Sequence, residues 1–182
     1  VIPANGGTAV RYTSFPNGAT GAAWSPNGNK FAFTLYVDDG NRRVLGLMDA
    51  FSGASPETLA DHSFDAVGSP TWSPDGSFIA YSVSSLALPN PAVSLIYSVP
   101  SLGGMPSQII GDGTWAVGGL DWSPDGLQIA YSSNQTGAYH IWIMSSNGDN
   151  ARQLTNGSGN EQNPAWSPNG SKIAYVASRQ EV

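Results

Sequence analysis

The chain repeats one order of apolar and polar residues four times. In each copy a tryptophan precedes the short segment Ser-Pro-(Asp or Asn)-Gly, and an apolar run follows it. The apolar runs cover residues 31–33, 79–81, 129–131 and 173–175. A catalytic loop normally occurs once in a domain, whereas a fourfold segment is expected when each copy builds one unit of a repeating architecture. The pattern therefore indicates a scaffold before it indicates chemistry.

The spacing of the copies indicates which unit is repeated. The copies are centred on four tryptophans: Trp24, Trp72, Trp122 and Trp166. These lie 48, 50 and 44 residues apart, at or slightly above the roughly 40 to 45 residues of a four-stranded propeller blade. Short, turn-bounded strands are predicted in the third copy at 118–123, 128–133, 140–146 and 151–156. The second of them is apolar on both faces, as a sheet buried between stacked blades requires.

The polar segment after each tryptophan predicts a tight turn between two antiparallel strands. Pro74 fixes φ at the second turn position, and Asp75 is tolerated at the third. Asp125 repeats this aspartate in the third copy, whereas Asn27 and Asn169 replace it in the other two. A turn accepts that exchange, but a carboxylate-dependent catalyst would not. Asp75 and Asp125 are therefore interpreted as structural, and the four tryptophans as packing residues between blades.

Composition supports a single all-β domain over residues 1–182. The hydrophobic fraction is 40%, and 22 glycines and 13 prolines are scattered without a period, which favours many short strands joined by turns. The net charge is −6 and no basic cluster is present, so a nucleic-acid surface is not expected. No apolar run reaches the roughly 20 residues that span a bilayer. The absence of cysteine excludes disulfides and thiolate metal sites.

The four Trp-Ser-Pro-(Asp or Asn)-Gly turns, each followed by an Ile-Ala-Tyr-like strand, resemble the repeats of TolB-type β-propellers. The third copy extends the likeness through residues 134–157 into the fourth. This resemblance implies a β-propeller used mainly for protein binding, or one that accompanies a separate enzyme, in the periplasm or outside the cell. The repeats are also similar to those of prolyl-oligopeptidase-like hydrolases and of an oligogalacturonate lyase group.

The two ends of the chain predict how the propeller closes. Residues 1–14 align with residues 143–156, so the chain begins within a third strand and ends after the second strand of the fourth copy. Pairing of these terminal strands would complete a four-bladed ring within one chain and leave no exposed edge. Two chains that exchange terminal half-blades would instead form an eight-bladed ring and a homodimer. An open fragment of a larger protein is the third alternative.

Loops on a rigid scaffold often carry function. In this topology the connections after the second and fourth strands of each blade share one end, here named the loop face. Candidate ligand-binding residues on that face are Trp115, Asp112, His62, Asp65, Asn160 and Glu161. Trp115 could anchor a peptide or stack on a sugar. His62 with Asp65 could polarise a water molecule, but with only two histidines in the chain we predict neither a metal site nor a cofactor.

The second repeat carries an unusual apolar connection at residues 84–93. Leu86 and Leu88 in it are candidates for contact with a partner, or they fold back over the blade. The sequence contains no Gly-x-Ser-x-Gly, phosphate loop or His-Glu-x-x-His motif, so no catalytic residue is predicted. The leading hypothesis is a non-catalytic propeller that binds a protein or peptide through its loop face. The alternative is a carbohydrate-binding propeller or the accessory propeller of a hydrolase or lyase.

Overall fold

The computed structural model describes residues 1, 4–8, 15–51, 55–63, 65–85 and 94–178. Regular structure in this part of the chain is β, apart from a single-turn 3-10 helix at Asp38–Gly40, and the expectation of an all-β fold is confirmed. No helix in the described ranges is long and apolar enough to cross a membrane.

Consecutive strands pair antiparallel, four to a blade. The first blade contains β1 (Ala19–Trp24), β2 (Lys30–Val37), β3 (Arg42–Asp49) and β4 (Glu57–Ala60). The second contains β5 (Asp65–Trp72), β6 (Phe78–Ser85), β7 (Ser94–Pro100) and β8 (Ser107–Ile110). The third contains β9 (Val117–Trp122), β10 (Gln128–Thr136), β11 (Ala138–Ser145) and β12 (Arg152–Gln153). The fourth repeat forms a half-blade of β13 (Asn160–Trp166) and β14 (Ile173–Ser178).

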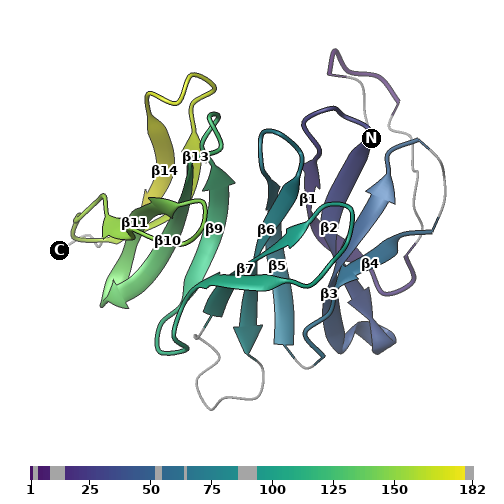
Figure 1. The fold of residues 1–182 in the computed structure, drawn as a ribbon, viewed down its shortest axis with the longest axis horizontal. Coiled ribbons are helices and arrows are strands. Elements are labelled where there is room, and N and C mark those ends of the chain that lie inside the picture. Colours follow the sequence, from purple (N-terminus) through teal and green to yellow (C-terminus); the bar gives the residue numbers. More distant parts are fainter. Residues whose placement is uncertain (2–3, 9–14, 52–54, 64, 86–93, 179–182) are drawn as a thin grey trace.

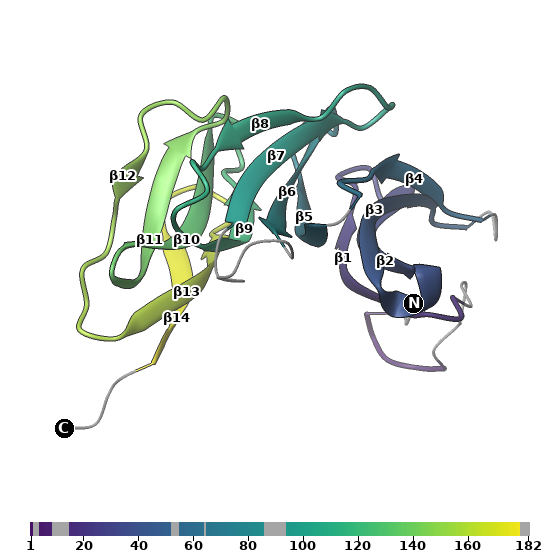
Figure 2. The same ribbon diagram turned by 90° about the horizontal axis from the view of Figure 1, so that it is seen from below.

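The blades stand side by side in an arc (Figures 1 and 2), with the two chain ends at opposite ends of it. Among the described residues β14 pairs only with β13, and residues 4–8 form turn and irregular structure. The sheets do not close into a ring, so closure within one chain and the number of blades are not confirmed. Residues 9–14, which belong to the aligned terminal segment, lie outside the described residues.

The core lies between blades rather than within one. One cluster joins Leu45 and Leu47 of the first blade to Val67, Trp72 and Tyr81 of the second. A second cluster joins the second blade to the third in the same way, through Ala80, Ile96, Val117, Trp122, Ile129 and Tyr131. Each blade is therefore stabilised by the apolar surface that it buries against its neighbour.

Exposure of the repeated residues follows their place in the arc. Trp72 and Trp122 are each 8% exposed, and the Trp72 indole N–H donates to the Ala23 carbonyl of the preceding blade at 3.0 Å. Trp24 is 48% exposed, because no blade precedes it in the described arc. Tyr131 is fully buried, whereas Tyr175, at the same position in β14, is 43% exposed. The same residue types therefore differ in burial only because their neighbours differ.

All four polar segments form the same hydrogen-bonded turn. In the second copy the Ser73 hydroxyl donates to Asp75 Oδ1 at 2.6 Å and accepts the Phe78 N–H at 2.9 Å. In the first copy the Ser25 hydroxyl donates to Asn27 Oδ1 at 2.8 Å, so asparagine supplies the same acceptor. Gly76 has φ of 73°, a conformation that disfavours other residues. The hydrogen bonds explain why the segment recurs.

Replacing Asp125 by asparagine is therefore expected to change the free energy of unfolding by less than about 0.5 kcal/mol. Asn27 and Asn169 already make the equivalent contacts in the other copies. Urea denaturation of the Asp125→Asn variant measures the change. A loss of several kcal/mol would show that asparagine does not supply the contacts that Asp125 makes in this turn.

Candidate functional site

The six residues predicted at the loop face lie at three blade junctions. His62 and Asp65 lie between the first and second blades, Asp112 and Trp115 between the second and third, and Asn160 and Glu161 at the start of β13. Within the described ranges no hydrogen bond or ion pair links one junction to another. The predicted face therefore consists of three separate environments, each with its own contacts.

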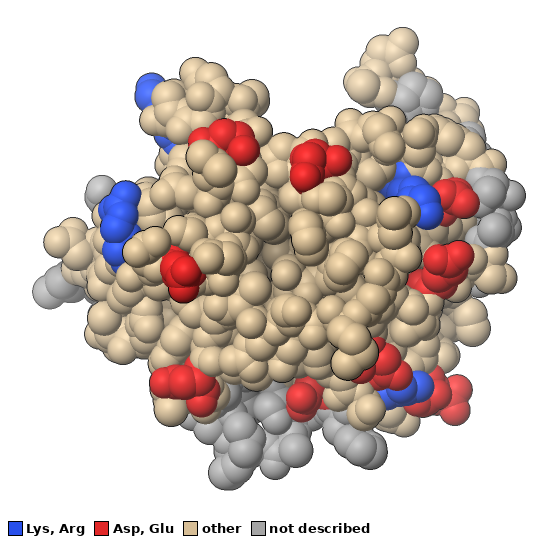
Figure 3. All heavy atoms as spheres, viewed as in Figure 1, with Lys and Arg blue, Asp and Glu red and all other residues tan. Residues whose placement is uncertain are grey.

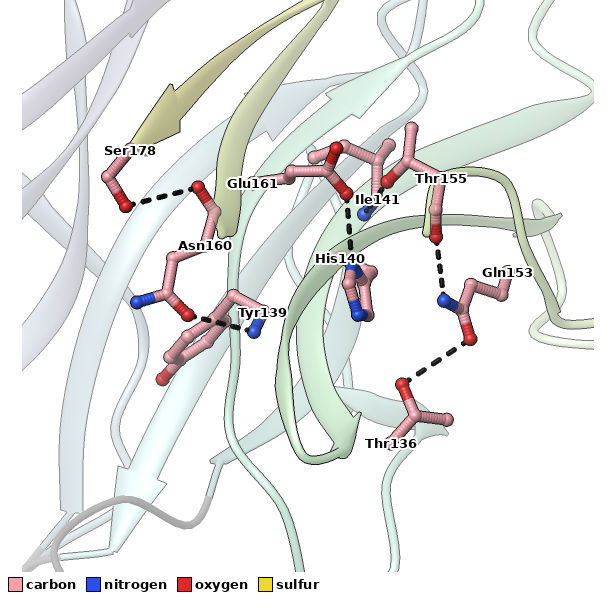
Figure 4. A network of polar contacts seen from close by, with 9 residues as sticks. All are labelled: Thr136, Tyr139, His140, Ile141, Gln153, Thr155, Asn160, Glu161 and Ser178. Atoms are coloured by element: carbon pink, nitrogen blue, oxygen red, sulfur yellow. Dashed lines mark hydrogen bonds and ion pairs between the residues drawn. The ribbon is translucent and has the colours of Figure 1, made fainter. Parts of the chain in front are cut away.

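The most buried polar contact of the three environments joins the third blade to the half-blade. His140 Nδ1 on β11 lies 2.9 Å from Glu161 Oε2 on β13. Figure 4 shows the two side chains facing each other between their strands. His140 is 8% exposed and Glu161 is 5% exposed. A buried carboxylate is tolerated only where it is paired and hydrogen-bonded, so the surrounding groups decide whether this one is stable.

Three donors surround the Glu161 carboxylate. Burial would raise the pKa of Glu161, but hydrogen bonds from the Thr155 hydroxyl, His140 and the Gly157 N–H outweigh it and lower the pKa from its ordinary value. Thr155 is itself held by the Ile141 N–H, which donates to its hydroxyl at 2.9 Å. A β-carbon on Gly157 would lie 2.5 Å from Glu161 Oε1, so a larger residue there would displace the carboxylate from its present position. The carboxylate is therefore ionised at neutral pH. Because an ionised carboxylate can only accept hydrogen bonds, His140 donates to it through the Nδ1–H group.

Sequence reasoning placed His140 on a strand but did not pair it with Glu161. By strand register His140 occupies the position that Leu95 has in the second blade and Val44 in the first. Glu161 lies five residues before its blade tryptophan, where the second and third blades carry Val67 and Val117. At this junction, two positions that are apolar in other copies of the repeat are occupied by the polar residues His140 and Glu161. An alignment of the repeats that showed both changes at once could have predicted the pair from the sequence.

Further contacts fix the half-blade to the third blade. Asn160 Oδ1 accepts the Tyr139 N–H at 3.1 Å (Figure 4), and at the other end of β13 the Asp121 carboxylate accepts the Trp166 N–H at 2.6 Å. Burial raises the pKa of Asp121, and the bond from the Trp166 N–H lowers it in part. Asn160 and Glu161 are thus engaged in joining two blades.

His62 forms a hydrogen bond with the hydroxyl of Tyr81 in the neighbouring blade. Its Nε2 lies 2.9 Å from the Tyr81 hydroxyl, and its ring packs 4.5 Å from the ring of Tyr97 between centroids. Burial lowers the pKa of His62, which favours the neutral ring, although Asp65 and Asp61 oppose the shift. No hydrogen bond joins Asp65 to His62 among the described residues. No group of three His, Asp or Glu side chains in the same ranges is placed to hold a metal ion.

At the remaining junction Asp112 organises its own loop. Its Oδ1 accepts the Thr114 N–H at 2.9 Å and the Thr114 hydroxyl at 2.6 Å, and these bonds lower the pKa of Asp112. Trp115 is half-buried and packs against the core cluster between the second and third blades. Leu86 and Leu88, the predicted partner contacts, lie outside the described residues.

The comparisons with known proteins agree with the repeat. A model of the TolB beta propeller domain matches residues 5–181. The chain belongs to this family. No curated protein matches it.

Solved TolB structures share the fold of this TolB-type domain. A TolB-type protein from Agrobacterium tumefaciens is 25% identical, with a TM-score of 0.75 over 90% of this chain and 56% of its own. TolB from Acinetobacter baumannii is 20% identical, with a TM-score of 0.80 over 96% of this chain and 41% of its own. Oligogalacturonate lyase from Vibrio parahaemolyticus is 16% identical, with a TM-score of 0.67 over 87% and 46%. The chain thus spans about half the length of these proteins, and the latter two show the fold alone.

Acidification is expected to destabilise this TolB-type domain partly through Glu161. Because its pKa in the fold is lower than in the unfolded chain, its contribution to stability is present above the unfolded pKa and is lost as the pH falls through the folded pKa. Urea denaturation at a series of pH values should show the gap between wild type and Glu161→Gln narrowing on acidification. A gap independent of pH would contradict an ionised Glu161.

Proposed function

We propose that this TolB-type domain is a non-catalytic scaffold that binds a protein or peptide through its loop face. The observation that carries the proposal is that its polar groups there are engaged within the fold: Glu161 by His140, His62 by Tyr81, Asp112 by Thr114 and Asn160 by Tyr139. Groups used in this way support rigid loops rather than acid–base chemistry. The TolB-type repeat also favours protein binding over catalysis.

Affinity capture tests this proposal. Immobilised domain is expected to retain a protein from an extract of its own cells, and Asp112→Arg, which changes an exposed side chain of the loop face, is expected to reduce that capture. Glu57→Arg at the exposed start of β4, which lines neither the loop face nor a groove, is the matched control and should retain the partner. A glycan array is run in parallel. Reproducible saccharide binding without a protein partner would contradict the proposal and favour the carbohydrate-binding alternative.

The scaffold is completed, in our proposal, by strands that cover the outer edge of β14. Residues 1–14 share the sequence pattern of residues 143–156, which include the end of β11 and all of β12 in the third blade. Because the ends of the arc lie far apart (Figures 1 and 2), this edge is better reached by a second copy than by the same chain. The exposed Tyr175 and Val176 of β14 and the exposed Trp24 of β1 support such pairing.

Light scattering distinguishes the two forms of closure. Two chains in one ring give a species of about twice the 18.9 kDa chain mass, as expected of a closed, symmetric assembly. A well-folded species at the mass of one chain would contradict exchange between two copies.

A further inference from the structure

The end opposite the loop face carries two adjacent grooves that no part of the proposed function uses. Each lies between the Trp-Ser-Pro-(Asp or Asn)-Gly turns of neighbouring blades. The first groove, of about 680 Å³, includes Pro26, Lys30, Asp49, Trp72, Asp75 and Leu102 in its lining. The second, of about 530 Å³, includes Pro74, Asp75, Phe78, Trp122 and Asp125. Asp75 lines both, so its turn forms the ridge that separates them.

The repeat itself produces these grooves. Each turn lies beside the turn of the preceding blade: a β-carbon on Gly76 would lie 3.7 Å from Pro26, and one on Gly126 would lie 3.7 Å from Pro74, both at van der Waals contact. The tryptophan of the repeat also lines each groove: Trp72 lines the first and Trp122 lines the second. Both grooves therefore combine an indole and prolines with a carboxylate at the edge.

Apolar side chains stand exposed at this end of the scaffold, and two of them, Leu102 and Phe78, line the grooves. Leu102 is 95% exposed and Met105 is 87% exposed on the β7–β8 turn, Leu127 is 66% exposed after the third-blade turn, and Phe78 is 43% exposed at the start of β6. The Ser101 hydroxyl donates to the Gly76 carbonyl at 2.7 Å, which fixes the β7–β8 turn beside the ridge. Exposed apolar groups gathered on one end of a scaffold mark a surface that binds a partner.

The charge of the grooves selects the kind of partner. Their charged lining residues are three carboxylates, Asp49, Asp75 and Asp125, and one ammonium, Lys30, which lies 3.7 Å from Asp49. The Ser73 and Ser77 hydrogen bonds lower the pKa of Asp75 to about 2, so this exposed group stays ionised at neutral pH. Figure 3 shows acidic groups distributed over the face in view, some of them beside basic groups, and the basic groups form no extended patch.

We propose that the two turn grooves bind an extended peptide segment in which apolar side chains alternate with lysine or arginine. The apolar side chains enter the grooves beside Trp72 and Trp122, and the basic groups lie against Asp75 and Asp125. Because Asp75 stands on the ridge between the grooves, one segment that crosses both passes directly over it. This surface lies at the opposite end of the scaffold from the loop face, so the two binding sites are independent.

The test uses the full chain and fluorescein-labelled peptides in an anisotropy titration. The probe is Ser-Lys-Leu-Lys-Ser-Lys-Leu-Lys-Ser, with one matched peptide carrying glutamate for lysine and another carrying serine for leucine. We expect the first to bind and both matched peptides to bind at least about tenfold more weakly, a difference of about 1.4 kcal/mol. Equal binding of the glutamate or serine peptide, or no binding of the first, would overturn the proposal.

Two variants and one control locate the peptide on the protein. Asp75→Asn with Asp125→Asn keeps the turn hydrogen bonds, since asparagine occupies this position in two other copies, and Leu102→Ser changes a side chain that is 95% exposed. Each is expected to weaken binding about tenfold, whereas Asp112→Asn at the loop face should not. If Asp112→Asn weakens binding as much as the groove variants do, the attraction is only the net charge. That result would overturn the proposal while leaving capture at the loop face unaffected.

Discussion

Replacing Trp122 by alanine is expected to lower the free energy of unfolding by about 3 to 5 kcal/mol. The indole is 8% exposed and belongs to the cluster that joins the second blade to the third, where it packs with Ile96 and Ile129. Truncation leaves a cavity between blades that the rigid sheets on either side cannot close. Urea denaturation followed by circular dichroism measures the loss.

Leu127 supplies the matched control, because it is also a large apolar residue of the third blade but is 66% exposed. Leu127→Ala is expected to change stability by less than about 0.5 kcal/mol. Near-wild-type stability of Trp122→Ala would show that the repeated tryptophan does not hold neighbouring blades together.

Replacing Glu161 by alanine is expected to cost about 3 kcal/mol, the scale of breaking a buried pair. His140, the Thr155 hydroxyl and the Gly157 N–H would all lose the carboxylate that they contact. The loss arises mainly from burying polar groups without partners rather than from the missing attraction.

A double variant separates these two causes. His140→Leu with Glu161→Val places at this junction the residue types that Leu95 and Val117 supply at the junction before it. Replacing a buried pair with apolar residues of similar volume is often neutral or stabilising, so the double variant is expected to recover most of the stability lost by Glu161→Ala. A double variant as unstable as the single one would contradict this interpretation. The melting temperatures of the wild type, Glu161→Ala and the double variant, measured under the same conditions, provide the comparison.

Features that depend on local sequence could be predicted. The turn around Asp75 needs only its own serine, aspartate and glycine, and the predicted strands at 118–123 and 128–133 overlap β9 and β10. Apolar residues on both faces of the second strand predicted burial between sheets, and Ile129, Ala130 and Tyr131 are fully buried. The all-β fold and the TolB-type family could be predicted from these local patterns, because the same turn and strand patterns occur in all four copies of the repeat.

Features that depend on contacts between blades could not be predicted in the same way. Glu161 and His140 are 21 residues apart in the sequence, and their contact appears only once the two blades lie side by side. The exposure of Tyr175 depends on the absence of a described strand beyond β14, although its sequence context matches that of the buried Tyr131. The six loop residues were grouped on one face by topology, but their separation into three junctions depends on side-chain packing.

Whether the fourth copy of the repeat becomes a complete blade is tested most directly by hydrogen exchange at β14 in the full chain. Pairing of β14 with a further strand predicts that the amides of Ile173–Ser178 exchange as slowly as those of β10, which has a strand on each side. Rapid exchange at the amides of β14 that point away from β13, together with slow exchange across β10, would contradict completion of the blade.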